Sequence, residues 1–443
     1  MDNQAHIMAT MRHLLQKSPV TDTEVILDGL TEATTRFANN HIHQNVAEDR
    51  REIACRVVQQ GQVGYARANQ MTGQAAENML QQAIARMEAH PVTCQNFQLV
   101  NPQQYKPLQN FDSTTAHLDA ARRADIVETI INRVKADGLL AAGTVLNGFH
   151  EIGVVNSRGV EAFHRFSHFH LTLTVYDQNN ASSWTAIEGT TCDPDEILPA
   201  VEKTVQRALR SKNPQEIPAG HYTVILEPAA TGTFIENLGW LAFGAKDHLQ
   251  KKSCLYNRIG ENVTGALVTV YDDAYHPLSL GMPFDYEGTS KQVAVLIDKG
   301  VASGIVHDSV TARLMNTQST GHSLPQPNPI GPIPGNLIMK QGPHSLEDII
   351  SDTKEGILIT RFHYNSIVNE KNTALTGLTR DGTFFIRNGE LAFPIKNLRY
   401  NERILGAFNR IEAISHKQIL TGEYSKVVVP ALKINHFHFT ANA

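Results

Sequence analysis

The stretch Phe234-Ile235-Glu236-Asn237-Leu238-Gly239-Trp240 is the most informative part of this sequence for its fold and function. It lies in a segment predicted to be helical over about 230–249. Zinc proteases place histidines and a glutamate on such a helix, because neutral imidazoles bind the metal and the carboxylate takes a proton from the metal-bound water. Here Glu236 is present, but Ile235 and Trp240 stand at the flanking positions where histidines would be needed. The pattern predicts a vestigial metalloprotease helix without its metal ligands.

The segments around this helix predict an α+β fold. A strand at Tyr222–Leu226 precedes the helix, and the sequence after it is mostly β-patterned with Gly and Pro punctuation. Upstream, amphipathic helices are predicted at 5–17, 73–89 and 115–137 and after Asp193, and alternating strands lie between them. We expect mixed α/β N-terminal domains at 1–92 and 93–217, followed by a β-rich C-terminal domain at 218–443. The segment Gln318–Gly335 is predicted to be a long, functional or mobile loop.

The composition excludes several classes of protein. The 443 residues are 41% hydrophobic and 19% charged with a net charge of −5, as expected of a folded protein with more than one domain. No basic run indicates nucleic-acid binding, and no apolar run reaches the roughly 20 residues that span a bilayer. The four cysteines are scattered, and the N-terminus lacks the pattern of a signal peptide, so we expect reduced thiols and a cytoplasmic location.

Motifs along nearly the whole chain resemble the TldD/PmbA family, also called the TldD/TldE proteases or modulators of DNA gyrase. The active member carries HExxGH in this helix, of which Glu236 and Gly239 remain. The other segments that carry the resemblance are Thr35–Asn39, His43–Val46, Val63–Ala66, Asn156–Gly159, Asp285–Thr289, Val293–Gly300, Ala312–Met315, Gly321-His322, Leu378–Gly382, Ile386–Glu390 and Pro430–Ile434.

The resemblance implies a particular kind of subunit. In the active member a cysteine near the C-terminus completes the metal site, and that place falls near Ser415-His416 here. The pattern agrees with the TldE (PmbA) members, which implies a heterodimer with a TldD-like HExxxH subunit. Zinc or iron is then expected in the partner and none in this chain. The implied substrates are unfolded or flexible peptides, which the two subunits would enclose in a chamber.

The residues alone leave alternatives open. Glu236 is interpreted as a solvated or capping residue, as a structural group at a subunit interface, or as a surviving catalytic group; Ile235 and Trp240 are interpreted as core or interface residues. Trp240 is also a candidate to fill the volume of the missing metal site. His248 and His416 could form a relocated metal site with Glu236, which would make the chain a self-sufficient metallopeptidase.

The remaining hypotheses concern the His-x-His segments and the oligomeric state. Three His-x-His segments, at 41–43, 168–170 and 436–438, have the spacing to place both imidazoles on one strand face. The simpler interpretation of each is a polar strand face whose central apolar residue points inward. A homodimer in isolation, or a homodimeric peptide-binding module without a protease partner, is the remaining functional hypothesis.

Overall fold

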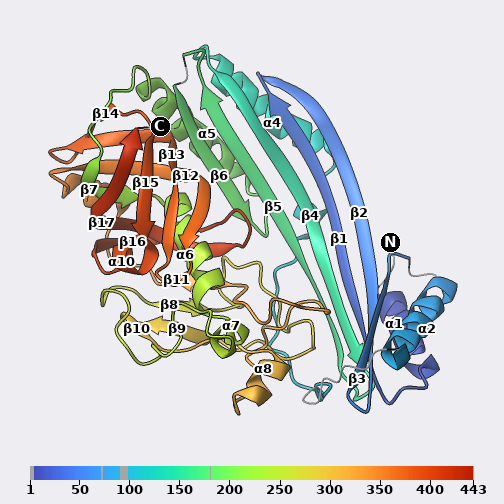
Figure 1. The fold of residues 1–443 in the computed structure, drawn as a ribbon. Coiled ribbons are helices and arrows are strands. Elements are labelled where there is room, and N and C mark those ends of the chain that lie inside the picture. The colour runs from blue at the N-terminus through green and yellow to red at the C-terminus, as the bar shows by residue number, and fades with distance from the viewer. Residues whose placement is uncertain (1–3, 71–72, 90–97, 180, 443) are drawn as a thin grey trace.

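The computed structural model describes residues 4–70, 73–89, 98–179 and 181–442, and it contains two β-sheets (Figure 1). The first sheet has the order β3-β2-β1-β4-β5-β6. Its strands are β1 (Asp22–Ala38), β2 (His41–Gln59), β3 (Gln62–Ala68), β4 (Leu140–Asn156), β5 (Glu161–Tyr176) and β6 (Ser182–Gly189). Strands from both sides of the predicted 92/93 boundary thus pair in one sheet, and the division into two N-terminal domains stays a prediction.

Helices cover one face of this sheet, which leaves the other face to the C-terminal half (Figure 1). The helices of this half are α1 (Gln4–Lys17), α2 (Gly73–Ala89), α3 (Ser113–Ala116), α4 (Ala120–Lys135) and α5 (Pro194–Arg210). Alternation along the strands explains the arrangement, since odd-numbered residues of β1 such as Val25 and Leu27 are buried in an apolar core with α1 and α2. The even-numbered residues Asp28 and Glu32 lie on the opposite, polar face.

The second sheet contains a closed barrel. Its strands are β7 (Gly220–Leu226), β8 (Val270–Asp272), β9 (Ala294–Asp298), β10 (Val301–Ala302), β11 (Leu337–Met339), β12 (Glu355–Asn369), β13 (Ala374–Arg387), β14 (Glu390–Pro394), β15 (Leu398–Arg403), β16 (Ile411–Thr421) and β17 (Val427–Asn442). Strand β7 pairs in parallel with β12 and antiparallel with β17, so β7, β12, β13, β15 and β17 form a closed ring.

Helices of the C-terminal half pack around this sheet, and one of them lies at the centre of its core. They are α6 (Pro228–Ala242), α7 (Ala245–Leu249), α8 (Ser309–Leu314), α9 (Leu346–Ser351) and α10 (Ile404–Phe408). The ring centroid of Phe234 on α6 lies 5.6 Å from that of Phe362, 6.0 Å from that of Tyr400 and 5.9 Å from that of Phe437. This aromatic cluster fixes α6 against the barrel.

The prediction of an α+β fold with a β-rich C-terminal half is confirmed by this architecture. The prediction of one continuous helix over 230–249 is wrong, because the chain leaves helical geometry at Gly244 (φ −76°, ψ 125°) and α7 starts anew. Gly244 forms a parallel bridge with Val306, and a Cβ there would lie 2.7 Å from the carbonyl oxygen of Pro332. Residues 318–335 contain no helix or strand, and within the described residues no helix is long and apolar enough to cross a bilayer.

A buried ion cluster joins the two halves. Arg56 of β2 lies 2.8 Å from the carboxylate of Glu24 on β1 and 3.6 Å from that of Glu287, which belongs to the Asp285–Thr289 motif of the C-terminal half. All three side chains are at most 3% exposed, and burial raises the pKa of Glu24 to about 7 although Arg56 opposes the shift. The motif therefore has a structural role, and Asp285 organises it by accepting amide hydrogens from Glu287 and Thr289.

Candidate functional site

Helix α6 presents its three motif positions to three different surroundings. Ile235 is fully buried in the apolar core, Glu236 is 5% exposed, and Trp240 is 37% exposed. Residues five apart on an α-helix point about 140° away from each other, which explains why Ile235 and Trp240 do not share a face. The interpretation of Ile235 as a core residue agrees with this placement, whereas Trp240 lies at the surface and does not fill an enclosed volume. Gly239 lets α6 approach β11, since a Cβ there would lie 2.6 Å from Leu337 Cδ1.

The carboxylate of Glu236 holds a loop. The backbone N–H of Glu423 donates to Oε2 at 3.2 Å, that of Tyr424 donates to Oε1 at 2.6 Å, and that of Ser425 also donates to Oε1. These residues form the connection between β16 and β17. Burial raises the pKa of Glu236, and the three amide hydrogen bonds act in the opposite direction. Glu236 thus binds this loop from the middle of α6 and lies away from both ends of its own helix.

The residues at the predicted ligand positions do not fit a metal ion. An isoleucine offers no lone pair, and an indole N–H only donates hydrogen bonds. Near the place of the third ligand, the Ser415 hydroxyl donates to the carbonyl of Lys417 and accepts from the amide of Ala431. Within residues 4–70, 73–89, 98–179 and 181–442, no group of three or more His, Cys, Asp or Glu side chains is placed to hold a metal.

The relocated site proposed for His248 and His416 is likewise not assembled. His248 is buried, and its Nε2 lies 3.0 Å from the carbonyl oxygen of Ala242 and 2.9 Å from Ser253 Oγ, so it caps the end of α6. Desolvation lowers the pKa of this imidazole. His416 is exposed on β16, and its Nδ1 lies 2.8 Å from the carbonyl oxygen of His344. Each imidazole has its own structural partner, and neither contacts Glu236.

A cavity of about 720 Å³ lies between the polar face of the first sheet and the C-terminal half. Glu236 lines it together with the loop it holds, while the opposite wall comes from β1, β4, β5 and β6. Its polar and charged lining residues are Glu32, His150, His168, His170, Thr172, Thr174, Glu188, Thr233, Glu236, Arg361, His363, Thr421, Glu423 and Lys426. Helix α6 therefore faces this cavity, which is called the chamber below and whose volume is that of a short peptide segment.

Histidine–carboxylate pairs form the sheet wall of this chamber. His168 Nε2 lies 3.0 Å from Glu32 Oε1, and both residues are in register with Gly148 of the intervening strand β4. His170 lies 3.4 Å from Glu188, its direct partner on β6. Glu188 also pairs with Lys426 beside the Glu236 loop. The hydrogen bond from His168 lowers the pKa of Glu32, which favours the ionised form of that carboxylate.

The His-x-His segments follow the simpler interpretation in two of three cases. Phe169 and Phe437 are buried, and His168 and His170 share the chamber face. His436 and His438 lie at one surface site with Arg403, Arg410 and Glu402, and Arg410 pairs with Glu402 at 2.8 Å. The segment 41–43 is exposed throughout, including Ile42 at 42%, so no residue of it points inward.

Comparison with known proteins defines the class to which this fold belongs. The chain shares its fold with the crystal structure of TldE from Thermococcus kodakarensis, at a TM-score of 0.88 and 19% identity, covering 98% of this chain and 99% of that chain. It is 30% identical over 224 residues to a metalloprotease of Methanocaldococcus jannaschii, covering 50% of this chain and 49% of that protein. A metalloprotease TldD homolog of Buchnera aphidicola is 27% identical over 201 residues, covering 44% and 41%. In these two alignments the chain spans less than half of each metalloprotease.

The family follows from the C-terminal half. Residues 219–441 match the family described as the PmbA/TldA metallopeptidase C-terminal domain. The chain belongs to this PmbA/TldD family, as its sequence motifs predicted.

Proposed function

We propose that this chain is a TldE-like, non-catalytic subunit of a metalloprotease that processes unfolded or flexible peptides. A TldD-like partner would supply the HExxxH motif and the zinc or iron, and this chain would supply part of the substrate chamber. The observation that carries the proposal is the state of α6, in which the carboxylate of Glu236 accepts three backbone amides and the flanking positions are Ile235 and Trp240.

The chamber supports a role in holding peptide. Its volume is about 720 Å³, and its wall contains the pairs His168–Glu32 and His170–Glu188. Such a space suits a flexible chain that carries both hydrogen-bond donors and acceptors. The described thiols Cys55, Cys192 and Cys254 are unpaired, which supports the proposed cytoplasmic location.

Reconstitution tests the proposal. The chain alone is expected to lack stoichiometric zinc or iron by elemental analysis and to leave a flexible fluorogenic peptide uncut. Mixing it with a TldD-like protein that carries HExxxH should yield a heterodimer by size-exclusion chromatography with light scattering, together with metal-dependent cleavage. Replacement of the partner's motif histidines should abolish cleavage, whereas Glu236→Gln in this chain should not.

Two results would contradict the proposal. Tight stoichiometric metal in the isolated chain, with cleavage lost in His248→Ala or His416→Ala, would establish a self-sufficient metallopeptidase. Peptide binding by a homodimer that forms no complex with any HExxxH relative would establish a peptide-binding module instead.

A further inference from the structure

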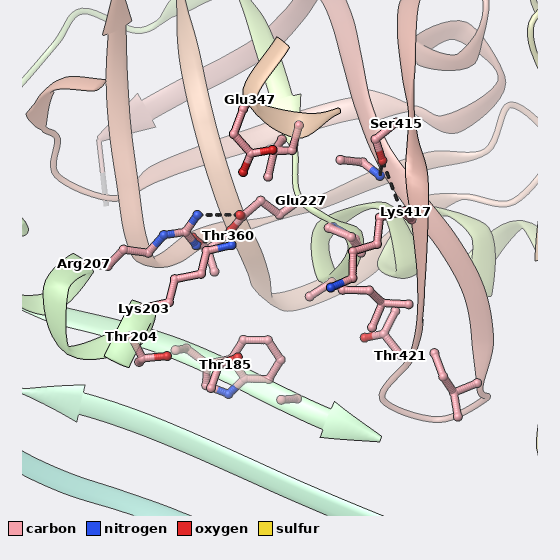
Figure 2. Close-up of a pocket in the computed structure, with 18 of the residues that line it drawn as sticks. Thr185, Lys203, Thr204, Arg207, Glu227, Glu347, Thr360, Ser415, Lys417 and Thr421 are labelled. Carbon is pink, nitrogen blue, oxygen red and sulfur yellow. Dashed lines mark hydrogen bonds and ion pairs between the residues drawn. The ribbon is translucent and has the colours of Figure 1, made fainter. Parts of the chain in front are cut away.

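A second, smaller pocket of about 270 Å³ lies where the two halves of the chain meet (Figure 2). Helix α5 and strand β6 form one side of it, and the start of α6 with β16 forms the other. Its apolar lining comes from Trp184, Ala186, Pro228, Ala229, Leu346, Ile419, Leu420 and Ala431. The space is sized for one or two residues and is mostly apolar, so an apolar side chain fits its interior.

The charged side chains of this pocket are unequally paired. Arg207 and Glu227 form two hydrogen bonds of 2.6 Å each, so their opposite charges offset one another within the wall. Lys203 on α5 and Lys417 on β16 approach the same space from opposite sides, and neither ammonium group forms an ion pair with a described residue (Figure 2). Glu347 also lines the pocket, without an ion pair to either lysine. Glu347 interacts electrostatically with Arg207, and Lys203 interacts with Glu227. Three cationic side chains and two carboxylates thus line the pocket, which leaves an excess of one positive charge.

The pocket adjoins the chamber. Trp184, Ala229 and Thr421 line both spaces, so these three side chains form the boundary that a peptide in the chamber would have to pass to reach the pocket. Ala229 belongs to the first turn of α6, and the N-cap residue Glu227 gives its carboxylate to Arg207 instead of capping that turn. The uncapped positive end of the helix adds to the potential set by the two lysines.

We infer that this pocket binds a carboxylate carried by an apolar residue, which is the chemistry of the C-terminal end of a peptide. Lys203 and Lys417 would contact the carboxylate, and the apolar walls would take the side chain beside it. The inference rests on the proposed peptide-binding role, and it adds that the chamber has a preferred direction: the substrate's free end lies in the pocket beside α5. An acidic side chain within a peptide offers the same chemistry, and the experiment separates the two sources.

Fluorescence anisotropy with three labelled peptides tests this inference on the full chain, alone and with its HExxxH relative. The peptides share a flexible sequence ending in Leu and differ in having a free C-terminal carboxylate, a C-terminal amide, or a C-terminal amide with Glu before the Leu. The free carboxylate is expected to bind about tenfold more tightly than the plain amide, as one charge-assisted contact provides. Lys203→Gln and Lys417→Gln should each remove most of that difference between the free carboxylate and the plain amide. Lys212→Gln, on the exposed segment after α5, is the matched control.

The outcomes separate this inference from the proposed function. Equal binding of all three peptides, or a preference for the carboxylate that survives both lysine substitutions, overturns the pocket assignment and leaves the chamber proposal standing. Tight binding of the Glu-containing amide that is lost in the lysine variants supports the pocket with a side-chain carboxylate as its ligand. Binding of no peptide in either state contradicts the proposed function itself.

Discussion

Replacing Glu236 should release the loop between β16 and β17 without unfolding the core. The carboxylate accepts amide hydrogens from Glu423, Tyr424 and Ser425, and hydrogen bonds to charged groups contribute about 1.5–3 kcal/mol each. The loop is exposed to solvent, with Tyr424 83% exposed, so hydrogen bonds to water replace part of the lost hydrogen bonds to Glu236. We therefore expect Glu236→Ala to lower the free energy of local opening by about 2–4 kcal/mol. Glu236→Gln should cost less, because its remaining oxygen still accepts.

Hydrogen exchange measured by mass spectrometry reports the free energy of local opening of this loop directly. A loss of about 2–4 kcal/mol corresponds to exchange that is roughly 30- to 1,000-fold faster at residues 423–425. Chymotrypsin should also cleave after Tyr424 more readily in the variant. Glu423→Gln is the control, since that residue contributes its amide and not its exposed side chain. Unchanged exchange in the loop would refute the reasoning, and so would an equal increase across the whole C-terminal half, which would make Glu236 a support of the core instead.

Three further predictions concern stability, each measured by chemical denaturation. Glu227→Gln should destabilise the fold by about 3–5 kcal/mol because it leaves Arg207, whose side chain is only 15% exposed, without its carboxylate partner, whereas a double change of both residues to Leu should recover most of that loss. Burial raises the folded-state pKa of Glu24 to about 7, above its unfolded value near 4.5, so its contribution is complete below pH 4.5 and is lost as the pH rises through 7. Glu24→Gln should flatten that slope, and an unchanged slope would contradict the pKa. Gly281→Ala should cost about 1–3 kcal/mol, because its Cβ would lie 1.8 Å from the carbonyl oxygen of Ala274; Gly73→Ala, with no atom within 4 Å, should cost nothing.

Much of the fold could be predicted from local patterns. The helix at 73–89 and the strand before α6 follow directly from their periodicity, and capping by Asp193 marks the start of α5. Strands β1 and β4 are longer than their apolar alternation indicates, because they continue through Asp28–Glu32 and 147–151, where that alternation stops. Leu30, Glu32 and His150 of these segments line the chamber, so the pattern is weakest where the strands reach the candidate site.

Only part of the candidate site could be predicted from the sequence. The missing ligands at Ile235 and Trp240 could be identified from spacing along one helix. The pairs of Glu32 with His168 and of Glu188 with His170 depend on strand register, which one sequence does not determine. The three amides that bind Glu236 come from residues nearly 190 positions later, and backbone groups carry no side-chain signature at all.

The pairing of β7 with β17 has a consequence for how this protein is made. The first sheet is complete once residue 189 has been synthesised, but Leu226 pairs with Ile359 on one side and with Leu432 on the other, so the barrel closes only with the last strand. On the ribosome, the N-terminal sheet can thus assemble early, while Phe234 of α6 lacks its contact with Phe437 until β17 has been synthesised. A nascent chain stalled before residue 427 would expose the centre of its largest core, so quality control has a long interval in which to recognise it.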